Sequence, residues 1–169
     1  YSEYYNQPRT FREVDGKNYA IGFDQWGSSG LAAVWAEENT RESIFSALRR
    51  KEAFATTGPR ITVRFFSGYN LSSIDINSEA LVDEAYKNGV PMGADLFADG
   101  AKVPEFIVWA QKDKHSASLQ RVQIIKGSID SGNARPSEKV FDVVCSDGLE
   151  VDPTTHRCPD NGARVNIEA

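Results

Sequence analysis

The sequence of 169 residues has few metal-binding side chains and no long apolar run. No segment approaches the roughly 18 apolar residues of a membrane span, so no membrane insertion is expected. The only histidines, His115 and His156, have no His partner at a zinc-type spacing. Because a catalytic zinc needs about three protein ligands, the sequence predicts no metal site and no catalytic residue of its own.

Motifs for other chemistry are missing as well. There is no Gly-x-Ser-x-Gly elbow, and Gly27-Ser-Ser-Gly30 lacks the lysine of a phosphate loop. The 19 basic residues are outnumbered by 24 acidic ones, giving a net charge of −5. Nucleic-acid surfaces need clustered positive charge, and the dense cluster at residues 49–51 is expected to end a helix, where cations complement its dipole. No nucleic-acid partner is therefore expected.

The clearest helical pattern spans about residues 40–54. Asn39 is the expected cap, with Glu42 completing a capping-box-like pair. The turn Thr56-Thr57-Gly58-Pro59 is expected to stop this helix, because proline disfavours helical geometry before it. An apolar stripe at helical spacing consists of Ile44, Phe45, Ala47 and Leu48.

A second helix is predicted at about 79–88, with Ser78 as cap and Gly89 as a left-handed C-terminal residue. From about residue 60 onward the apolar period changes to two, which is typical of strands. Strands are expected at 19–23, 61–66, 105–111, 119–126 and 139–145. Short strands separated by turns predict an α+β chain that is mainly a β-sandwich-like module.

The chain divides into two expected parts. Residues 1–60 read as the tail of a helical, mixed unit, and residues 61–169 read as a β-rich module with one inserted helix. Both ends of the sequence look like cuts, so we expect a piece of a longer protein, with the module truncated at its C-terminus.

Cys145 and Cys158 are 13 positions apart and are separated by turn-forming residues. The favoured interpretation is a structural disulfide in a periplasmic or secreted protein, contributing about 3 kcal/mol. Two reduced thiols, or pairing with a cysteine outside the sequence, are the alternatives. With His156 these cysteines fall one ligand short of a zinc site. The possible oxygen ligands of this region are Asp147, Asp152, Asp160 and Asn161. These residue types favour turns over a calcium site.

The most suggestive polar residues are Glu37, Arg41 and Arg60. Glu37 and Arg41 are four positions apart and would share a helix face if the helix began early. Arg60 follows a Thr-Thr-Gly-Pro turn, where amides and a guanidinium suit an oxyanion or carboxylate. A plain salt bridge and a capped turn are the alternative explanation.

A different hypothesis is a non-catalytic module that binds a glycan or a protein partner through exposed aromatic residues. The candidates are Tyr69, Phe97 and Trp109. Trp109 lies in the middle of a predicted strand, where a core position is the simpler explanation.

Several runs carry a resemblance to a known family. They are GLAAVWAEENTRESIFSALRRKEAFATTGPRI at 30–61, GVPMGADL at 89–96, FIVWAQKD at 106–113, LQRVQIIKG at 119–127 and CSDGLEVDPTTHRCPDNGA at 145–163. In this order they resemble the closing segment of a bacterial family of unknown function that is related to the PHP (polymerase and histidinol phosphatase) metal-dependent hydrolases.

The resemblance implies a distorted β/α barrel that holds two or three divalent metals, manganese or zinc, and hydrolyses small phosphate or related esters, followed by a β-sandwich. Residues 1–60 would be the remnant of that barrel, and its missing N-terminal portion would be the partner. The family's metal-ligand motifs do not occur here. The chain is therefore expected to be an inactive C-terminal fragment of a phosphoesterase- or sulfoesterase-like hydrolase. Glu37, Arg41 and Arg60 would line or brace the barrel mouth, and a further family cysteine would compete for the pairing.

Overall fold

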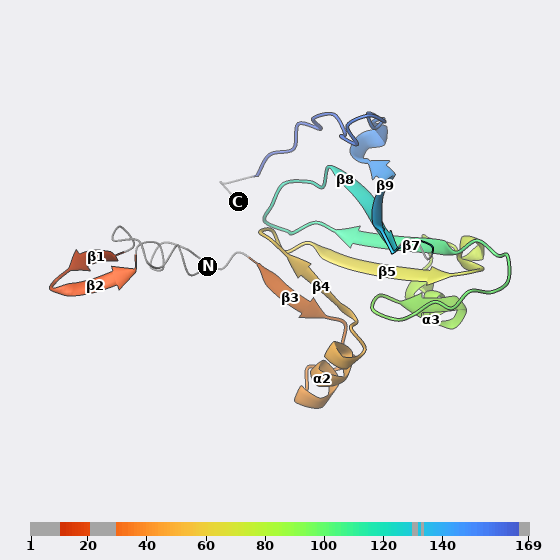
Figure 1. The fold of residues 1–169 in the computed structure, drawn as a ribbon, viewed down its shortest axis with the longest axis horizontal. Coiled ribbons are helices and arrows are strands. Elements are labelled where there is room, and N and C mark those ends of the chain that lie inside the picture. Colours follow the sequence, from red (N-terminus) through yellow and green to blue (C-terminus); the bar gives the residue numbers. More distant parts are fainter. Residues whose placement is uncertain (1–10, 21–29, 130–131, 133, 166–169) are drawn as a thin grey trace.

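The computed structural model describes residues 11–20, 30–129, 132 and 134–165 (Figure 1). Within these residues the chain is a mixed α and β structure, and its strands form antiparallel sheets that do not close into a barrel. The paired strands are β1 (Phe11–Val14) with β2 (Lys17–Ala20), β3 (Leu31–Val34) with β4 (Ala53–Thr56), β8 (Arg121–Ile129) with β9 (Pro136–Cys145), and β5 (Thr62–Gly68) between β6 (Gly89–Pro91) and β7 (Glu105–Gln111). The predicted α+β class is confirmed at this level.

The predicted first helix is a shorter helix followed by a strand. Helix α2 (Arg41–Arg49) ends before Lys51, whose φ of 61° turns the chain out of the helix. Strand β4 then runs antiparallel to β3, with Val34 opposite Ala53. The prediction of helix to residue 54 was wrong, because the alanines of β4 favour a helix locally and pairing with β3 overrides that preference. The turn at residues 56–59 ends this strand instead of the helix.

The cap and the buried face of α2 also differ from the prediction. Thr40, not Asn39, is the N-cap, and its side-chain oxygen accepts a hydrogen bond from the Ser43 N–H at 3.3 Å. In the predicted apolar stripe, Ala47 is buried, but Phe45 and Leu48 are 60% and 52% exposed.

The three-stranded sheet and α3 (Leu81–Asn88) contain the main core. Strand β5 pairs along its whole length with β7, from Thr62 opposite Gln111 to Gly68 opposite Glu105. The strands predicted at 61–66 and 105–111 are thus confirmed. A buried cluster forms where β5 meets α3 and the short 3₁₀ turn η1 (Leu71–Ser73). Its members are Phe66, Leu71, Ile74 and Ala85.

Helix α3 ends without the predicted left-handed glycine. Gly89 has φ −153°, which is extended, and begins β6 directly. Glycine is required there for a different reason, because a Cβ on Gly89 would lie 2.5 Å from the Ser67 main-chain oxygen. At the other end, the N-cap is Ala80, and Ser78 accepts a hydrogen bond from its N–H at 3.1 Å without capping the helix.

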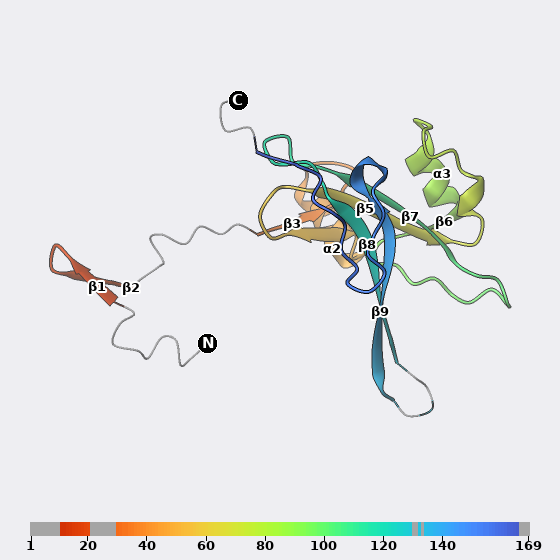
Figure 2. The ribbon, with the colours of Figure 1, turned by 90° about the horizontal axis from the view of Figure 1, so that it is seen from above.

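Strands β8 and β9 form a two-stranded ribbon that projects from the rest of the chain (Figure 2). They confirm the strands predicted at 119–126 and 139–145 and extend further toward the connecting loop. The register shifts between Val122 and Gln123. Of the strand predicted at 19–23, residues 19 and 20 belong to β2, and residues 21–23 lie outside the described part. None of the helices in the described ranges is long and apolar enough to cross a membrane.

Candidate functional site

Arg64, in the middle of β5, lies with its guanidinium over the indole ring of Trp35, 3.8 Å from the ring centroid. The indole is fixed in turn, since its Nε1–H donates to the Val63 main-chain oxygen at 3.0 Å. The same ring packs against Phe54 with 5.8 Å between centroids. A cation over an indole face is stabilised by the ring quadrupole. The stacked pair therefore joins β5 to the β3–β4 hairpin.

Two hollows meet at this pair, and Trp35, Arg64 and Val82 line both of them. The smaller hollow, of about 210 Å³, is completed by the apolar residues Phe66, Leu81, Ile107 and Trp109. The larger hollow, of about 470 Å³, is completed by Ala36, Glu37, Arg50, Glu52, Tyr86 and Pro91. An apolar compartment next to a charged one is the usual arrangement of a small-molecule site. We take these two hollows as the candidate site.

Glu52 is the buried carboxylate of the candidate site, with 3% of its surface exposed. It accepts a hydrogen bond from the Tyr86 hydroxyl on α3. Its other oxygen accepts one from Arg50 Nη2 at 3.3 Å. Burial, followed by the bond to Glu52, raises the pKa of Tyr86, so the phenol stays neutral. The buried charge is thus satisfied by residues of this chain.

Arg64 is satisfied less completely. Its Nη1 is shielded from solvent and has no hydrogen-bond acceptor within the described part of the chain. Stacking uses the face of a guanidinium and leaves its N–H groups pointing outward from the edge, where oxyanions bind in a bidentate manner. Nη1 of Arg64 is therefore the unmet donor of the candidate site. The guanidinium also interacts with the Tyr86 hydroxyl, which opposes the larger effects of burial and Glu52 on the pKa of Tyr86.

The structure brings only one of the three predicted polar residues to the hollows. Glu37 lines the larger hollow. Arg41 is the first residue of α2, and Glu37 precedes the Thr40 cap, so the two do not share a helix face. Arg60 is exposed, and it is its main-chain N–H that donates to Asp113 Oδ2, at 2.8 Å.

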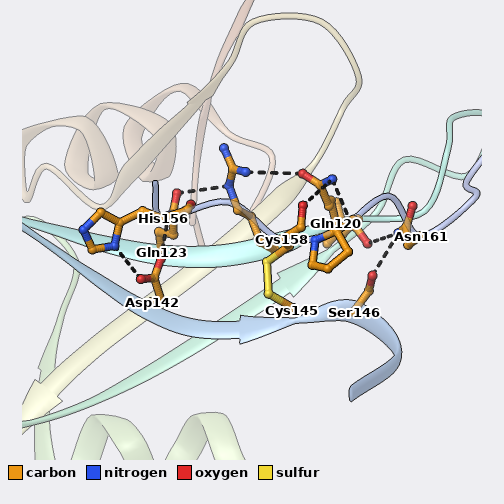
Figure 3. Close-up of a disulfide and its surroundings, with 11 residues drawn as sticks. Gln120, Gln123, Asp142, Cys145, Ser146, His156, Cys158 and Asn161 are labelled. Atoms are coloured by element: carbon orange, nitrogen blue, oxygen red, sulfur yellow. Dashed lines mark hydrogen bonds and ion pairs between the residues drawn. A yellow bond between two sulfur atoms is a disulfide. The ribbon is translucent and has the colours of Figure 1, made fainter. Parts of the chain in front are cut away.

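The disulfide region is a separate cluster at the base of the β8–β9 ribbon (Figure 3). Cys145, the last residue of β9, is bonded to Cys158, with 5.7 Å between their Cα atoms. The Gln120 side chain donates to the main-chain oxygens of Cys158 and Pro159, at 3.4 and 3.3 Å. Asn161 donates to Ser146 Oγ at 2.9 Å. These contacts tie the final described segment to the ribbon.

His156 belongs to the same cluster and contacts Asp142 of β9 (Figure 3). Its Nδ1 lies 2.6 Å from Asp142 Oδ2, and Gln123 donates to the other oxygen at 2.6 Å. The hydrogen bond from Gln123, followed by the one with His156, lowers the pKa of Asp142. Asp152 accepts the N–H groups of residues 154 and 155 at 2.8 and 3.1 Å. This is turn geometry, as the sequence predicted for this acid.

Metal chemistry finds no ligand set in the residues that the structure describes. No group of three or more His, Cys, Asp or Glu side chains there is placed to hold an ion. His115, the second histidine, lies exposed in the turn after β7. The described residues therefore do not fit a divalent metal centre.

The exposed aromatic residues of the alternative hypothesis occupy two places. The Tyr69 hydroxyl donates to the Phe97 main-chain oxygen at 2.8 Å, and Phe97 is 82% exposed. Trp109 is 40% exposed and lines the smaller hollow. Its side chain is therefore only partly buried and does not lie in the core.

Comparison with known families identifies the chain. A family model described as "Protein of unknown function (DUF3604)" matches residues 2–169. The chain belongs to the DUF3604 family. No curated protein and no solved structure matches it.

In this DUF3604 chain, most residues of the candidate site were missed by sequence reasoning. Arg64 lies inside the strand predicted at 61–66, and Trp35 lies in the run at 30–61 without a predicted function. Glu52 lay inside the predicted helix, and Tyr86 inside the second one. A signal was present for Arg64, because a charged residue in a strand between aromatic and β-branched neighbours requires a partner.

Proposed function

We propose that this DUF3604 chain is the non-catalytic C-terminal part of a metal-dependent phosphoesterase- or sulfoesterase-like hydrolase. In this proposal residues 1–60 end a PHP-like barrel, residues 61–169 form a sandwich-like module, and the manganese or zinc ligands belong to a preceding part of the protein. The runs that resemble a family related to such hydrolases support it. The observation that carries it is the charged hollow beside Trp35, which the longest of these runs, residues 30–61, helps to build.

The residues of this chain would bind and orient the ester rather than cleave it. The Arg64 edge offers charge-assisted hydrogen bonds to a phosphate or sulfate. Glu37, at the rim of the larger hollow, offers an acceptor for a donor group elsewhere on the substrate. The disulfide between Cys145 and Cys158 supports a periplasmic or secreted location, where such bonds persist.

The proposal is tested by assaying two proteins side by side. One is the complete product of the reading frame that contains this chain, and the other is the 169-residue chain. Hydrolysis of bis(4-nitrophenyl) phosphate and 4-nitrophenyl sulfate is measured with manganese and with zinc. We expect turnover by the complete product only. Equal turnover by both, or none by the complete product, contradicts the proposal.

An alternative function is a binding module for a glycan or protein partner. The exposure of Phe97 and Trp109 favours it, because large exposed aromatic side chains are typical of recognition surfaces. Each of the two residues can be tested by its own substitution. A glycan-array screen of the chain should give ligands that Phe97→Ala and Trp109→Ala each weaken, and the absence of any such ligand contradicts this function.

A further inference from the structure

We infer that the two hollows together bind an apolar ring that carries an oxyanion, such as an aryl sulfate, aryl phosphate or aryl carboxylate. The ring occupies the smaller hollow, and the oxyanion meets the edge of Arg64 where the hollows join. The inference names a substrate class for the site and rests on the proposed function only in calling the ligand a substrate.

The walls of the smaller hollow select the ring. Apart from Arg64, its lining consists of aromatic and aliphatic side chains, including Phe66, Ile107 and Trp109. A sugar ring placed there would leave hydroxyl groups without partners, which costs free energy. An aromatic ring has no such groups and packs well against indole and phenyl faces. The hollow of about 210 Å³ has room for one such ring.

The charges at the junction of the two hollows favour an oxyanion. Glu52 is already satisfied by Tyr86 and Arg50, so it does not neutralise Arg64. The Arg64 guanidinium is stacked on Trp35, and its Nη1 has no acceptor in the described part of the chain. An oxyanion at this edge supplies that acceptor as well as the opposite charge. A neutral acceptor would satisfy the donor but would leave the positive charge of Arg64 uncompensated.

Binding at this position requires a small movement. Arg64 Nη1 is shielded from solvent, and the Tyr86 ring lies 6.0 Å from the guanidinium. Tyr86 and Arg50 are both exposed side chains of the larger hollow. We expect Arg50 to shift when the oxyanion binds, while Tyr86 keeps its bond to Glu52 and Trp35 stays in place because of its bond to Val63.

The test is isothermal titration of the whole chain with phenyl sulfate, the ring and the anion together. Sodium sulfate and phenol are the two halves, and sodium glucuronate represents an acidic sugar. We expect phenyl sulfate to bind at least about tenfold more tightly than the other three probes, because only it engages both hollows. Binding of phenyl sulfate that is absent, or no tighter than that of sulfate or glucuronate, overturns the inference.

Variants locate the binding. Arg64→Gln should weaken phenyl sulfate at least about tenfold, as expected for the loss of charge-assisted hydrogen bonds. Lys139→Gln is the matched control, since it removes a cation that lies 4.8 Å from the Phe141 ring on the β8–β9 ribbon. It should leave the affinity for phenyl sulfate unchanged. Equal affinities of these two folded variants overturn the inference. If Arg64→Gln does not fold, Trp109→Ala, at a half-exposed wall, is the second variant. It should weaken the binding of phenyl sulfate and leave the binding of sulfate unchanged. Unchanged binding of phenyl sulfate also overturns the inference.

The binding and turnover experiments fail independently. If the chain binds phenyl sulfate tightly but the complete product shows no turnover, the proposed hydrolase function is contradicted and the binding site is supported. If the complete product shows turnover but Arg64→Gln does not change the affinity for phenyl sulfate, the hydrolase function is supported and the binding site is contradicted.

Discussion

The Tyr86 hydroxyl donates a hydrogen bond to the carboxylate of Glu52, and this contact fixes α3 to the turn that precedes β4. The two residues are 34 positions apart in the sequence. Arg50 completes the group from the end of α2. One buried carboxylate thus holds together three elements around the larger hollow, and its loss should be felt in stability as well as in the shape of the site.

Tyr86→Phe should lower the free energy of unfolding by about 1.5–3 kcal/mol, the usual contribution of a hydrogen bond to a charged group. Because burial and the bond to Glu52 raise the pKa of Tyr86, its stabilisation is present below the unfolded value near 10 and is lost as pH rises through the folded value. Urea unfolding at pH 7 measures the first effect. Tyr69→Phe, which removes a bond to an exposed main-chain oxygen, is the control; an equal loss in both variants would contradict this account.

Gly93→Ala should destabilise the chain more than Gly100→Ala. Both glycines have positive φ, 85° and 59°, so both variants carry a cost of about 1–2 kcal/mol for the left-handed backbone. Only at Gly93 would the new Cβ meet other atoms, with the Lys51 main-chain oxygen 2.2 Å away. Overpacking adds about 1–3 kcal/mol. Thermal unfolding of the two variants gives the comparison. Equal melting temperatures would show that Gly93 does not pack this closely against Lys51.

Removal of the disulfide by Cys145→Ser together with Cys158→Ser should cost about 3 kcal/mol, as expected for a loop of this size. The loss should be matched by reducing the wild-type chain, and the double variant should not respond to the reductant. Free thiols are counted under denaturing conditions before and after reduction. Two titratable thiols in the unreduced protein, or equal stability of both proteins, would exclude the bond.

Asp142→Asn should lower stability at pH 7 and have a smaller effect at about pH 2. The pKa of Asp142 is lowered by Gln123 and then by His156, so its stabilisation is present above the unfolded value and is lost as pH falls through the folded value. As the pH falls toward the folded pKa, the native carboxyl takes up a proton and the difference between the two proteins becomes smaller. Urea unfolding at both pH values tests this; the same loss at each would indicate a purely steric effect.

Local patterns predicted the parts of the fold that depend on local periodicity. Strands β5 and β7 have seven residues each and are rich in β-branched and aromatic residues, which favour strands over helices. Strands β3 and β4 have four residues each and are rich in alanine, so only their pairing with each other defines them. Gly89 was predicted to be left-handed and is extended instead; a glycine is needed there because of the Ser67 oxygen of a neighbouring strand.

The candidate site was less accessible to prediction because its residues come from separate elements. Glu37 was selected for its sequence neighbours and does line the larger hollow. Arg64 and Trp35 are 29 positions apart (64 − 35), and the stacking between them follows from how the β3–β4 hairpin meets β5. No spacing rule connects such residues. Residues from elements that meet only in the tertiary fold become visible as a site only in three dimensions.

The central claim is that an oxyanion attached to an apolar ring binds between the two hollows, at Arg64. NMR titration of ¹⁵N-labelled chain with phenyl sulfate tests it most directly, by following the Arg64 Nε–H and the indole N–H signals of Trp35 and Trp109. The account predicts saturable shifts at these three groups, with one dissociation constant and little change along the β8–β9 ribbon. Shifts that concentrate on the ribbon or near Tyr69 and Phe97, with Arg64 unmoved, would contradict it.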